Sequence, residues 1–483
     1  MDRFTIVATD YTAKKQSDQA GKIDYAWKAY NGELTPPLKR RPGQPDDNVL
    51  VNTSKVIVDK GVSFLFGKGV TWNLDSDETR SLDEKYLDDT WAFSGGDVLL
   101  HKLALNGGIT GHAFLKMRIE QPFIKLSALD SSTVDVVTAD NDYTDVIAYV
   151  ITWFGRKDPI TGKQKKYRQI IQKMRAQLVL DEMSGVATEI PQHWLIIDQE
   201  SVTQHGSQDV WKDMGTEFWN YPFAPIVDCQ NLPTANTFWG QSDLERDIIA
   251  LNESINRSLS NINRIIRNHA HPKTWSKGLT ESQIQQIVID PDGMIHLPGE
   301  FGSLQNLEMA SDLGSSLAYY KELKTALYEI SRVPKIAFGN EENVNYLAAV
   351  AMQVLYGPLI EKTDVKHRTY GALVRETNRR ILAIAGRGDD NLCELVWPSV
   401  LPKDSVMEAQ VALMQQQAGV SRDTTLRNMG FNPEHERQAR KQDDAEAATK
   451  AKLMAAADAA GRPQPTGPQM PEKPSPKTVT PNP

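Results

Sequence analysis

The chain has 483 residues and a mass of 54.0 kDa, which is enough for two to four domains. Hydrophobic residues make up 40% of it, so packed cores are possible and a wholly disordered polymer is excluded. The formal net charge is −8, with 54 basic and 62 acidic side chains. This balance argues against a protein that grips duplex DNA over its whole surface, because such proteins need many more basic residues.

Neither the cysteines nor the apolar stretches indicate a secreted or membrane protein. Cys229 and Cys393 lie far apart and belong to no CxxC pair, so neither a zinc site nor a disulfide framework is predicted. The amino terminus has no apolar signal core, and charged residues interrupt the apolar run from Val56 to Val70, which is too short for a membrane span. We expect a soluble protein of a reducing cytoplasm.

The first part of the chain predicts an arm followed by a mixed domain. Residues 1–48 are polar and contain a Pro-Pro pair, which predicts an arm or loosely packed lead-in, so folding is expected to begin at Val49. A helix is predicted from Val98 to Ile109. Runs rich in β-branched and aromatic residues predict strands at Ala113–Ile119, Val134–Val137, Val146–Trp153 and Trp194–Ile197, with hairpin turns at 141–142 and 158–162.

From Leu244 onward, apolar residues recur at steps of three and four residues. This spacing predicts one long helix, from Asp243 to Ala270, with a narrow apolar stripe. Its other faces are rich in Asn and Arg. Burying a Leu or Ile contributes roughly 1.5–3 kcal/mol, so the stripe stabilises little if it stays in water. Either the helix packs on its own domain, or it packs against identical neighbouring subunits. The stripe consists of Leu244, Ile248, Leu251, Ile255, Leu259, Ile262 and Ile266.

A small module separates this helix from the next one. Pro272 ends the first helix, because proline lacks an amide hydrogen and disfavours helix at the residue before it. The following pattern predicts, in order, a short helix at 280–288, a turn at 290–293, a strand at 294–297, a helix at 313–333, a loop at 334–346 and a helix to about residue 385.

The C-terminal part predicts one strand and then helices. Leu392 to Trp397 alternates like a strand. Helices are predicted at 405–417, with Asp404 as N-cap, at 421–430, with Ser421 as cap, and from Pro433 to Ala460. Residues 461–483 contain many prolines and no apolar core, which predicts a disordered tail.

No catalytic or metal site is predicted. The pair Gly67-Lys68 lacks the spaced glycine and the Ser or Thr of a phosphate-binding loop. His269 and His271 have no carboxylate at helical ligand spacing, which favours a surface role over metal binding. His101, His112 and Asp97 would form a site only if the fold brought them together.

Four stretches stand out, although none of them is a catalytic signature. They are Asn48–Asn52 with Val56–Gly67, Pro225–Glu245, Ile330–Pro334 with the helix after it, and Gly419–Thr425. In their order and spacing, over about four fifths of the chain, they resemble the portal proteins of tailed bacteriophages. The chain departs from the family where the long helix begins, because Asn345-Tyr346-Leu347-Ala348-Ala349 replaces the usual Ser-Gly-x-Ala type of step.

The resemblance implies an α+β portal-type fold. Its parts would be an α/β wing, a two-helix stem, a small α/β clip, a long tunnel-side helix, a helical crown and a disordered tail. The implied boundaries are 1–48 for the N-terminal arm, 49–239 with 386–403 for the wing, 240–270 and 313–333 for the stem helices, 271–312 for the clip, 334–346 for the tunnel loop, 347–385 for the long helix, 404–460 for the crown and 461–483 for the tail.

The resemblance also implies a non-enzymatic homo-oligomeric ring, usually a dodecamer, at one capsid vertex of the virion, assembled in the host cytoplasm. Duplex DNA would pass through it without sequence specificity. Implied partners are the terminase large subunit, the major capsid and scaffolding proteins, and a head-completion or neck adaptor; no cofactor, metal or membrane is implied. The implied site residues are the apolar stripe as subunit interface, a tunnel loop facing DNA at Asn340, Glu341, Glu342 and Asn343, and a clip docking surface at Lys273, Trp275, Lys277 and His296.

Two other classes of function are kept as alternatives. A nuclease or other hydrolase with an unrecognised α+β site would act on DNA with a metal, and changing one carboxylate would abolish its activity. A capsid-binding scaffold that forms no pore would give filaments or small oligomers. Mild acidity suits a conduit, because a strongly basic tunnel would hold each passing phosphate.

Overall fold

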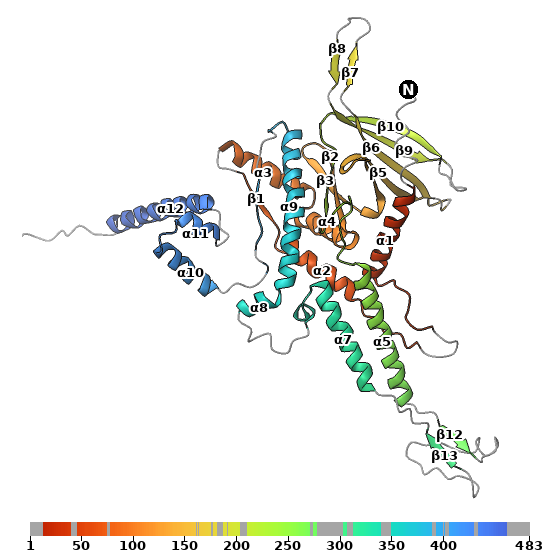
Figure 1. Cartoon of the computed structure of the whole chain (residues 1–483). Helices are drawn as coiled ribbons and strands as arrows, with labels where there is room; N and C mark the ends of the chain where they lie inside the picture. Colours follow the sequence, from red (N-terminus) through yellow and green to blue (C-terminus); the bar gives the residue numbers. More distant parts are fainter. Residues whose placement is uncertain are drawn as a thin grey trace, which may run out of the picture. The chain divides into compact units, whose positions relative to one another are not determined.

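The computed structural model divides the chain into two units, Met1–Lys403 and Asp404–Pro483. It describes residues 13–39, 46–74, 78–160, 162, 164–174, 177–180, 187–190, 192–202, 210–270, 274–277, 303–306, 313–339, 349–388, 393–398, 400, 405–428 and 433–460. The first unit combines α-helices with antiparallel sheets (Figure 1), which confirms the predicted α+β class.

The described helices of the first unit are α1 (Ala13–Asn31), α2 (Thr53–Phe66), α3 (Glu78–Phe93), α4 (Gly96–Thr110), α5 (Arg246–Ala270), α7 (Leu313–Ser331), α8 (Ala349–Leu355) and α9 (Gly357–Ile384), with short 3₁₀ turns at Ser131–Thr133 and Lys335–Phe338. The second unit contains α10 (Ser405–Gln417), α11 (Arg422–Asn428) and α12 (Pro433–Ala460). The predicted bounds of α10 and α12 are confirmed, and Ser421 caps α11 by accepting the amide of Thr424.

The strands form several antiparallel sheets. A five-stranded sheet has the order β10-β9-β6-β5-β4, and a three-stranded sheet has the order β11-β2-β3. Three further pairs are β1 with β14, β12 with β13, and β7 with β8. Their bounds are β1 Thr71–Asn73, β2 His112–Ile119, β3 Ile124–Leu129, β4 Val134–Ala139, β5 Asp142–Lys157, β6 Gln164–Met174, β7 Gln177–Leu180, β8 Ala187–Ile190, β9 His193–Ser201, β10 Trp211–Trp219, β11 Ile226–Gln230, β12 Thr274–Lys277, β13 Ser303–Asn306 and β14 Glu394–Val396.

The predicted strands and turns of the N-terminal half are confirmed, because their signals are local. The four predicted runs lie within β2, β4, β5 and β9. The turn after β5 is closed by the amide of Gly162, which donates to the Asp158 carbonyl at 2.9 Å. Gly162 has φ of 65°, a left-handed conformation that glycine adopts without steric cost.

Two predictions about helices are wrong. Residues 1–48 are not simply an arm, because α1 buries Ile23, Ala26 and Ala29. Two of these are small alanines, so the apolar periodicity of α1 is weak in the sequence. The helix expected to run on to residue 385 is interrupted at Tyr356, where Gly357 and Pro358 begin α9. Proline is tolerated in the first turn of a helix but not in its interior.

Two hydrophobic cores organise the first unit. The larger one contains buried residues of α1, α2, α4, α5 and α9, and the smaller one is built from strands of the two larger sheets and includes Phe114, Ile171 and Trp194. α5 packs beside α7, and both extend away from the five-stranded sheet (Figure 1). The base of this helix pair therefore contacts the larger core.

Candidate functional site

A buried charge cluster lies immediately before α5. The Asp243 carboxylate accepts hydrogen bonds from the ammonium groups of Lys366 at 2.5 Å and Lys362 at 3.0 Å. All three residues are buried. The two lysines are one turn apart on α9, so they reach the same carboxylate from one face of that helix. The cluster joins segments that are more than 100 residues apart in sequence.

Two glycines leave the space that this cluster and its neighbours occupy. A Cβ at Gly108 would lie 3.1 Å from Asp243 Oδ2, and a Cβ at Gly107 would lie 2.0 Å from the hydroxyl oxygen of Tyr370. Burial alone raises the pKa of the Asp243 carboxyl, but the charges of Lys362 and Lys366 outweigh it and lower the pKa to about 2. Asp243 is therefore ionised at any physiological pH.

Further hydrogen bonds connect the cluster to the ends of several elements. The Asn231 amide donates to Asp243 Oδ1 at 3.3 Å and accepts from the Tyr370 hydroxyl at 3.2 Å. Lys362 also donates to the carbonyl of Ser331, the last residue of α7, at 3.4 Å. The start of α5, the end of α7 and the middle of α9 are thus held at one point.

The polar face of α5 has a structural role that its composition did not reveal. Side chains at four-residue spacing on α5 accept backbone amides of residues 47–53, a segment without regular structure that ends at the first residue of α2 and that we call the strap. Their oxygens lie 2.9–3.4 Å from these amide nitrogens. The donors are Val49, Val51 and Thr53, and the acceptors are Ser260, Asn256 and Asn252. Part of this face is buried, although its side chains are polar.

The apolar stripe of α5 is not a free subunit interface. Leu244, Ile248, Ile255 and Ile262 are buried within the single chain. Leu251 and Leu259 are partly buried against the same core, and Ile266 is 50% exposed. The interface assignment is therefore corrected: the stripe packs on its own chain, and of its seven residues only Ile266 is largely open to another molecule.

Most of the other sequence-predicted site residues lie outside the described part of the chain. This holds for the four tunnel-loop residues Asn340, Glu341, Glu342 and Asn343, and for Lys273 and His296 of the clip. Trp275 and Lys277 both lie on β12, which pairs with β13, and Lys277 is exposed.

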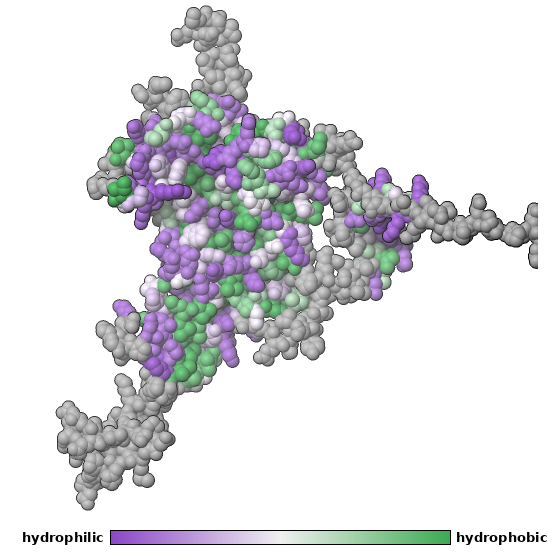
Figure 2. All heavy atoms as spheres, turned by 180° about the vertical axis from the view of Figure 1, so that it is seen from behind, coloured by the Kyte–Doolittle hydropathy of each residue, from purple (hydrophilic) through white to green (hydrophobic). Residues whose placement is uncertain are grey.

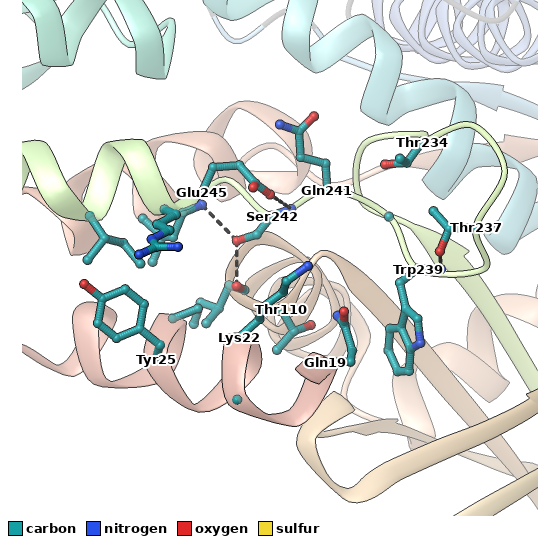
Figure 3. A pocket seen from close by; sticks show the side chains of 17 residues that line it. Gln19, Lys22, Tyr25, Thr110, Thr234, Thr237, Trp239, Gln241, Ser242 and Glu245 are labelled. Carbon is teal, nitrogen blue, oxygen red and sulfur yellow. Dashed lines mark hydrogen bonds between the residues drawn. The ribbon is translucent and has the colours of Figure 1, made fainter. Parts of the chain in front are cut away.

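A pocket of about 900 Å³ opens beside the start of α5 (Figure 3). One wall comes from α1, with Lys22 and Tyr25, and the opposite wall comes from the segment that leads into α5. That segment is fixed by two hydrogen bonds: the Ser242 amide donates to Glu245 Oε1, and the Leu244 amide donates to Ser242 Oγ. Trp239 lines the end of the pocket near Thr237.

A second polar group, unrecognised in the sequence, lies where β2 meets β11. His112 Nε2 is 2.9 Å from Asp228 Oδ2, and the Tyr149 hydroxyl donates to Asp228 Oδ1 at 2.6 Å. The His112 ring stacks on Phe238 with centroids 4.5 Å apart. His112 therefore pairs with Asp228 and not with Asp97, while His101 is exposed. Burial and the Asp228 charge hold the pKa of Tyr149 well above its usual range.

The described residues contain no cluster of metal ligands. None of their His, Cys, Asp and Glu side chains form a group of three or more that could hold a metal ion. Burial raises the pKa of both cysteine thiols, to about 11 for Cys393 and well above the usual range for Cys229. Within the same residues, no helix is both long and apolar enough to span a bilayer. The Asp243 cluster is therefore a structural junction between helices, and the pocket beside the start of α5 is an open surface next to it.

Comparison with known proteins identifies the class. The family model described as phage portal protein, SPP1 Gp6-like, matches residues 10–452, which is nearly the whole chain. The chain belongs to this family of phage portal proteins. No curated protein matches it.

Among solved structures, the chain is similar to one described as the virion of a native gene transfer agent (GTA) particle. The sequence identity is 12% and the TM-score is 0.45. The match covers 85% of this chain and 94% of that one.

Proposed function

We propose that this protein forms a ring, a dodecamer by analogy with its family, that serves as the DNA channel at one capsid vertex. The observation that carries the proposal is the family match over residues 10–452. Duplex DNA would be packaged through the ring by a terminase motor, retained and later ejected. The major capsid and scaffolding proteins would surround the ring, and a neck adaptor would bind it after packaging.

The fold supports the assignment of parts. We propose that α5 and α7 are the stem helices of residues 240–270 and 313–333, and that β12 and β13 belong to the clip at 271–312. Residues 49–239 with 386–403 would form the wing, 334–346 the tunnel loop, 347–385 the long helix and 404–460 the crown. The pairing of β14 with β1 supports the return of the chain to the wing.

The channel would act by geometry and charge and not by catalysis. A chain with a net charge of −8 holds DNA poorly as a whole by counterion release, which is compatible with DNA moving past it. We propose that Glu341 and Glu342 face the DNA. Replacing both with Lys would add cations to each subunit, and the rings should then retain DNA more strongly at low salt than wild-type rings do. Equal retention would contradict the tunnel-loop assignment.

Electron microscopy of the purified full-length protein tests the central proposal. We expect rings with a central hole, and mass photometry of the same sample should give one dominant multiple of 54.0 kDa. Filaments or small oligomers without a hole would favour a scaffold that forms no pore. Metal-dependent cleavage of DNA, abolished by changing one carboxylate, would favour the hydrolase.

A further inference from the structure

The pocket beside the start of α5 combines an apolar floor with cationic groups that have no partner. Ile249 and Leu244, both buried, form part of its floor, together with Ala26 of α1. Lys22 and Arg246 also line the pocket and are exposed. Among the described residues, neither has a hydrogen-bond or ion-pair partner. A ligand that fits this pocket would present apolar side chains flanked by carboxylates.

α7 presents such a surface. Of its 19 residues, the structure buries only Leu327 and Ser331. Tyr319 is 60% and Ile330 is 47% exposed, and the apolar character of the α5–α7 pair is visible from behind in Figure 2. Tyr319 and Ile330 are eleven positions apart, which is close to three helical turns, so both lie on one face of α7.

The acidic residues of α7 border this apolar face. Glu322 and Glu329 are exposed, lie seven residues apart, and therefore share one side of the helix next to Tyr319 and Ile330. Neither carboxylate has a side-chain partner within the described residues. At about 100° per residue, Lys321 and Lys324 point to the opposite side of the helix. The exposed face of α7 is thus apolar and acidic, as the pocket requires.

The pocket and this face of α7 lie on different sides of α5. Near its start, Arg246 and Ile249 face the pocket next to α1, whereas Asp247 and Ile248 line a separate hollow with Ile330 and Arg332 of the α7 end. Two different complementary surfaces on one subunit make a heterologous contact, which generates a closed ring when the rotation between subunits closes.

We propose that the pocket formed by α1 and the start of α5 receives the Tyr319–Ile330 face of α7 from a second copy of this chain. The inference rests on the proposed ring and names the surfaces that would join its subunits. Lys22 and Arg246 would pair with Glu322 and Glu329 of the neighbouring copy, and Tyr319 would contact the apolar floor. This contact replaces the apolar stripe of α5 as the expected interface.

Gly21 offers a variant that fills the pocket without disturbing the fold. It lines the pocket, and a Cβ at this position would meet no atom within 4 Å. Gly21→Trp should therefore keep the helix, since replacing glycine favours helix formation, while its indole occupies the space of the incoming side chain. Arg246→Glu reverses one pocket charge in the first turn of α5, where an acidic residue is favourable.

The test compares full-length variants by size-exclusion chromatography with light scattering and by negative-stain microscopy. Wild type and the charge-reversal control Lys28→Glu, which lies on α1 outside the pocket, should form rings. Gly21→Trp and Arg246→Glu should lose at least nine tenths of the ring fraction while circular dichroism shows folded subunits. Combining Lys22→Glu and Arg246→Glu with Glu322→Arg and Glu329→Arg should restore rings, because both proposed charge pairs are then exchanged.

The outcomes separate the two proposals. If wild type forms no ring, the proposed function fails. If wild type assembles and the folded Gly21→Trp and Arg246→Glu variants assemble equally well, the pocket is not an interface and the inference is overturned. If these variants lose rings but the α7 charge reversals restore nothing, α7 is not the occupant, and the inference is likewise overturned.

Discussion

Replacing Asp243 with Asn should destabilise the subunit more than any single change at the lysines that surround it. Lys362 and Lys366 are both buried and share this one carboxylate. Asn at this position leaves two buried ammonium groups without a counter-charge. Breaking a buried ion pair by removing one partner costs ~3–5 kcal/mol. We expect Asp243→Asn to lower the free energy of unfolding by about that amount near neutral pH.

The same carboxylate predicts a pH dependence of stability. Its pKa is about 2 in the folded chain, against an ordinary value of 3.8. A lowered folded-state pKa contributes stability that is fully present above 3.8 and is lost as the pH falls through about 2. This difference corresponds to roughly 2–3 kcal/mol. The stability gap between wild type and Asp243→Asn should narrow by that amount as the pH is lowered through this window.

Urea unfolding followed by tryptophan fluorescence, at a protein concentration low enough to keep subunits apart, measures both effects. Lys366→Met keeps most of the side-chain volume and leaves Lys362 paired with Asp243. It should therefore lower the free energy of unfolding by much less than Asp243→Asn does. Asp364→Asn, at a side chain that is 61% exposed, should change stability by less than about 0.5 kcal/mol. Equal costs for Asp243→Asn and Lys366→Met would refute the shared-carboxylate argument.

Three further predictions follow from burial and hydrogen bonding. Ile255→Asp should unfold or strongly destabilise the isolated subunit, because Ile255 is 1% exposed in its own core; folded monomers that merely fail to form rings, seen by circular dichroism and chromatography, would contradict this. Asn256→Ala removes the acceptor for the Val51 amide and should cost about 1–3 kcal/mol, with faster proteolysis of the strap as the readout; unchanged cleavage would argue against the polar contacts. Cys229 and Cys393, with raised thiol pKa values, should react with Ellman's reagent near neutral pH only after denaturation; rapid reaction of the native protein would contradict their burial.

Local patterns were sufficient to predict about half of the described elements but not their packing. The β-branched and aromatic runs in β2, β5 and β9 and the proline at the start of α12 act on neighbouring residues, so the sequence predicted these elements directly. The stripe on α5 predicted a helix with one apolar face, yet the periodicity contains no information about what covers that face. Here the face is buried in a core that also contains residues far away in sequence, including Val58 and Leu359.

The strap and the buried charge cluster show why the junction could not be predicted. Asn252, Asn256 and Ser260 are spaced by four residues. In the sequence, however, nothing tells whether their side chains form hydrogen bonds with water or with a backbone segment about 200 residues earlier. Lys362 and Lys366 likewise resemble an exposed charged face of a helix. Only the apolar residues around them on α9, such as Leu359, Tyr370 and Leu373, indicate that this face is buried.

Whether an apolar residue is buried within its own chain or exposed also decides where subunits can form a contact. A residue that is buried within its own chain cannot supply much contact energy to a neighbour, whereas an exposed apolar residue gains roughly 25 cal/mol for each Å² that a neighbour covers. The apolar stripe of α5 is therefore mostly buried inside the subunit, and Ile266 alone would contribute little energy to a contact between subunits. Tyr319 and Ile330 on α7 are still available. If the ring is held together along its stem, the energetic contribution has to come from the helix that the single chain leaves exposed.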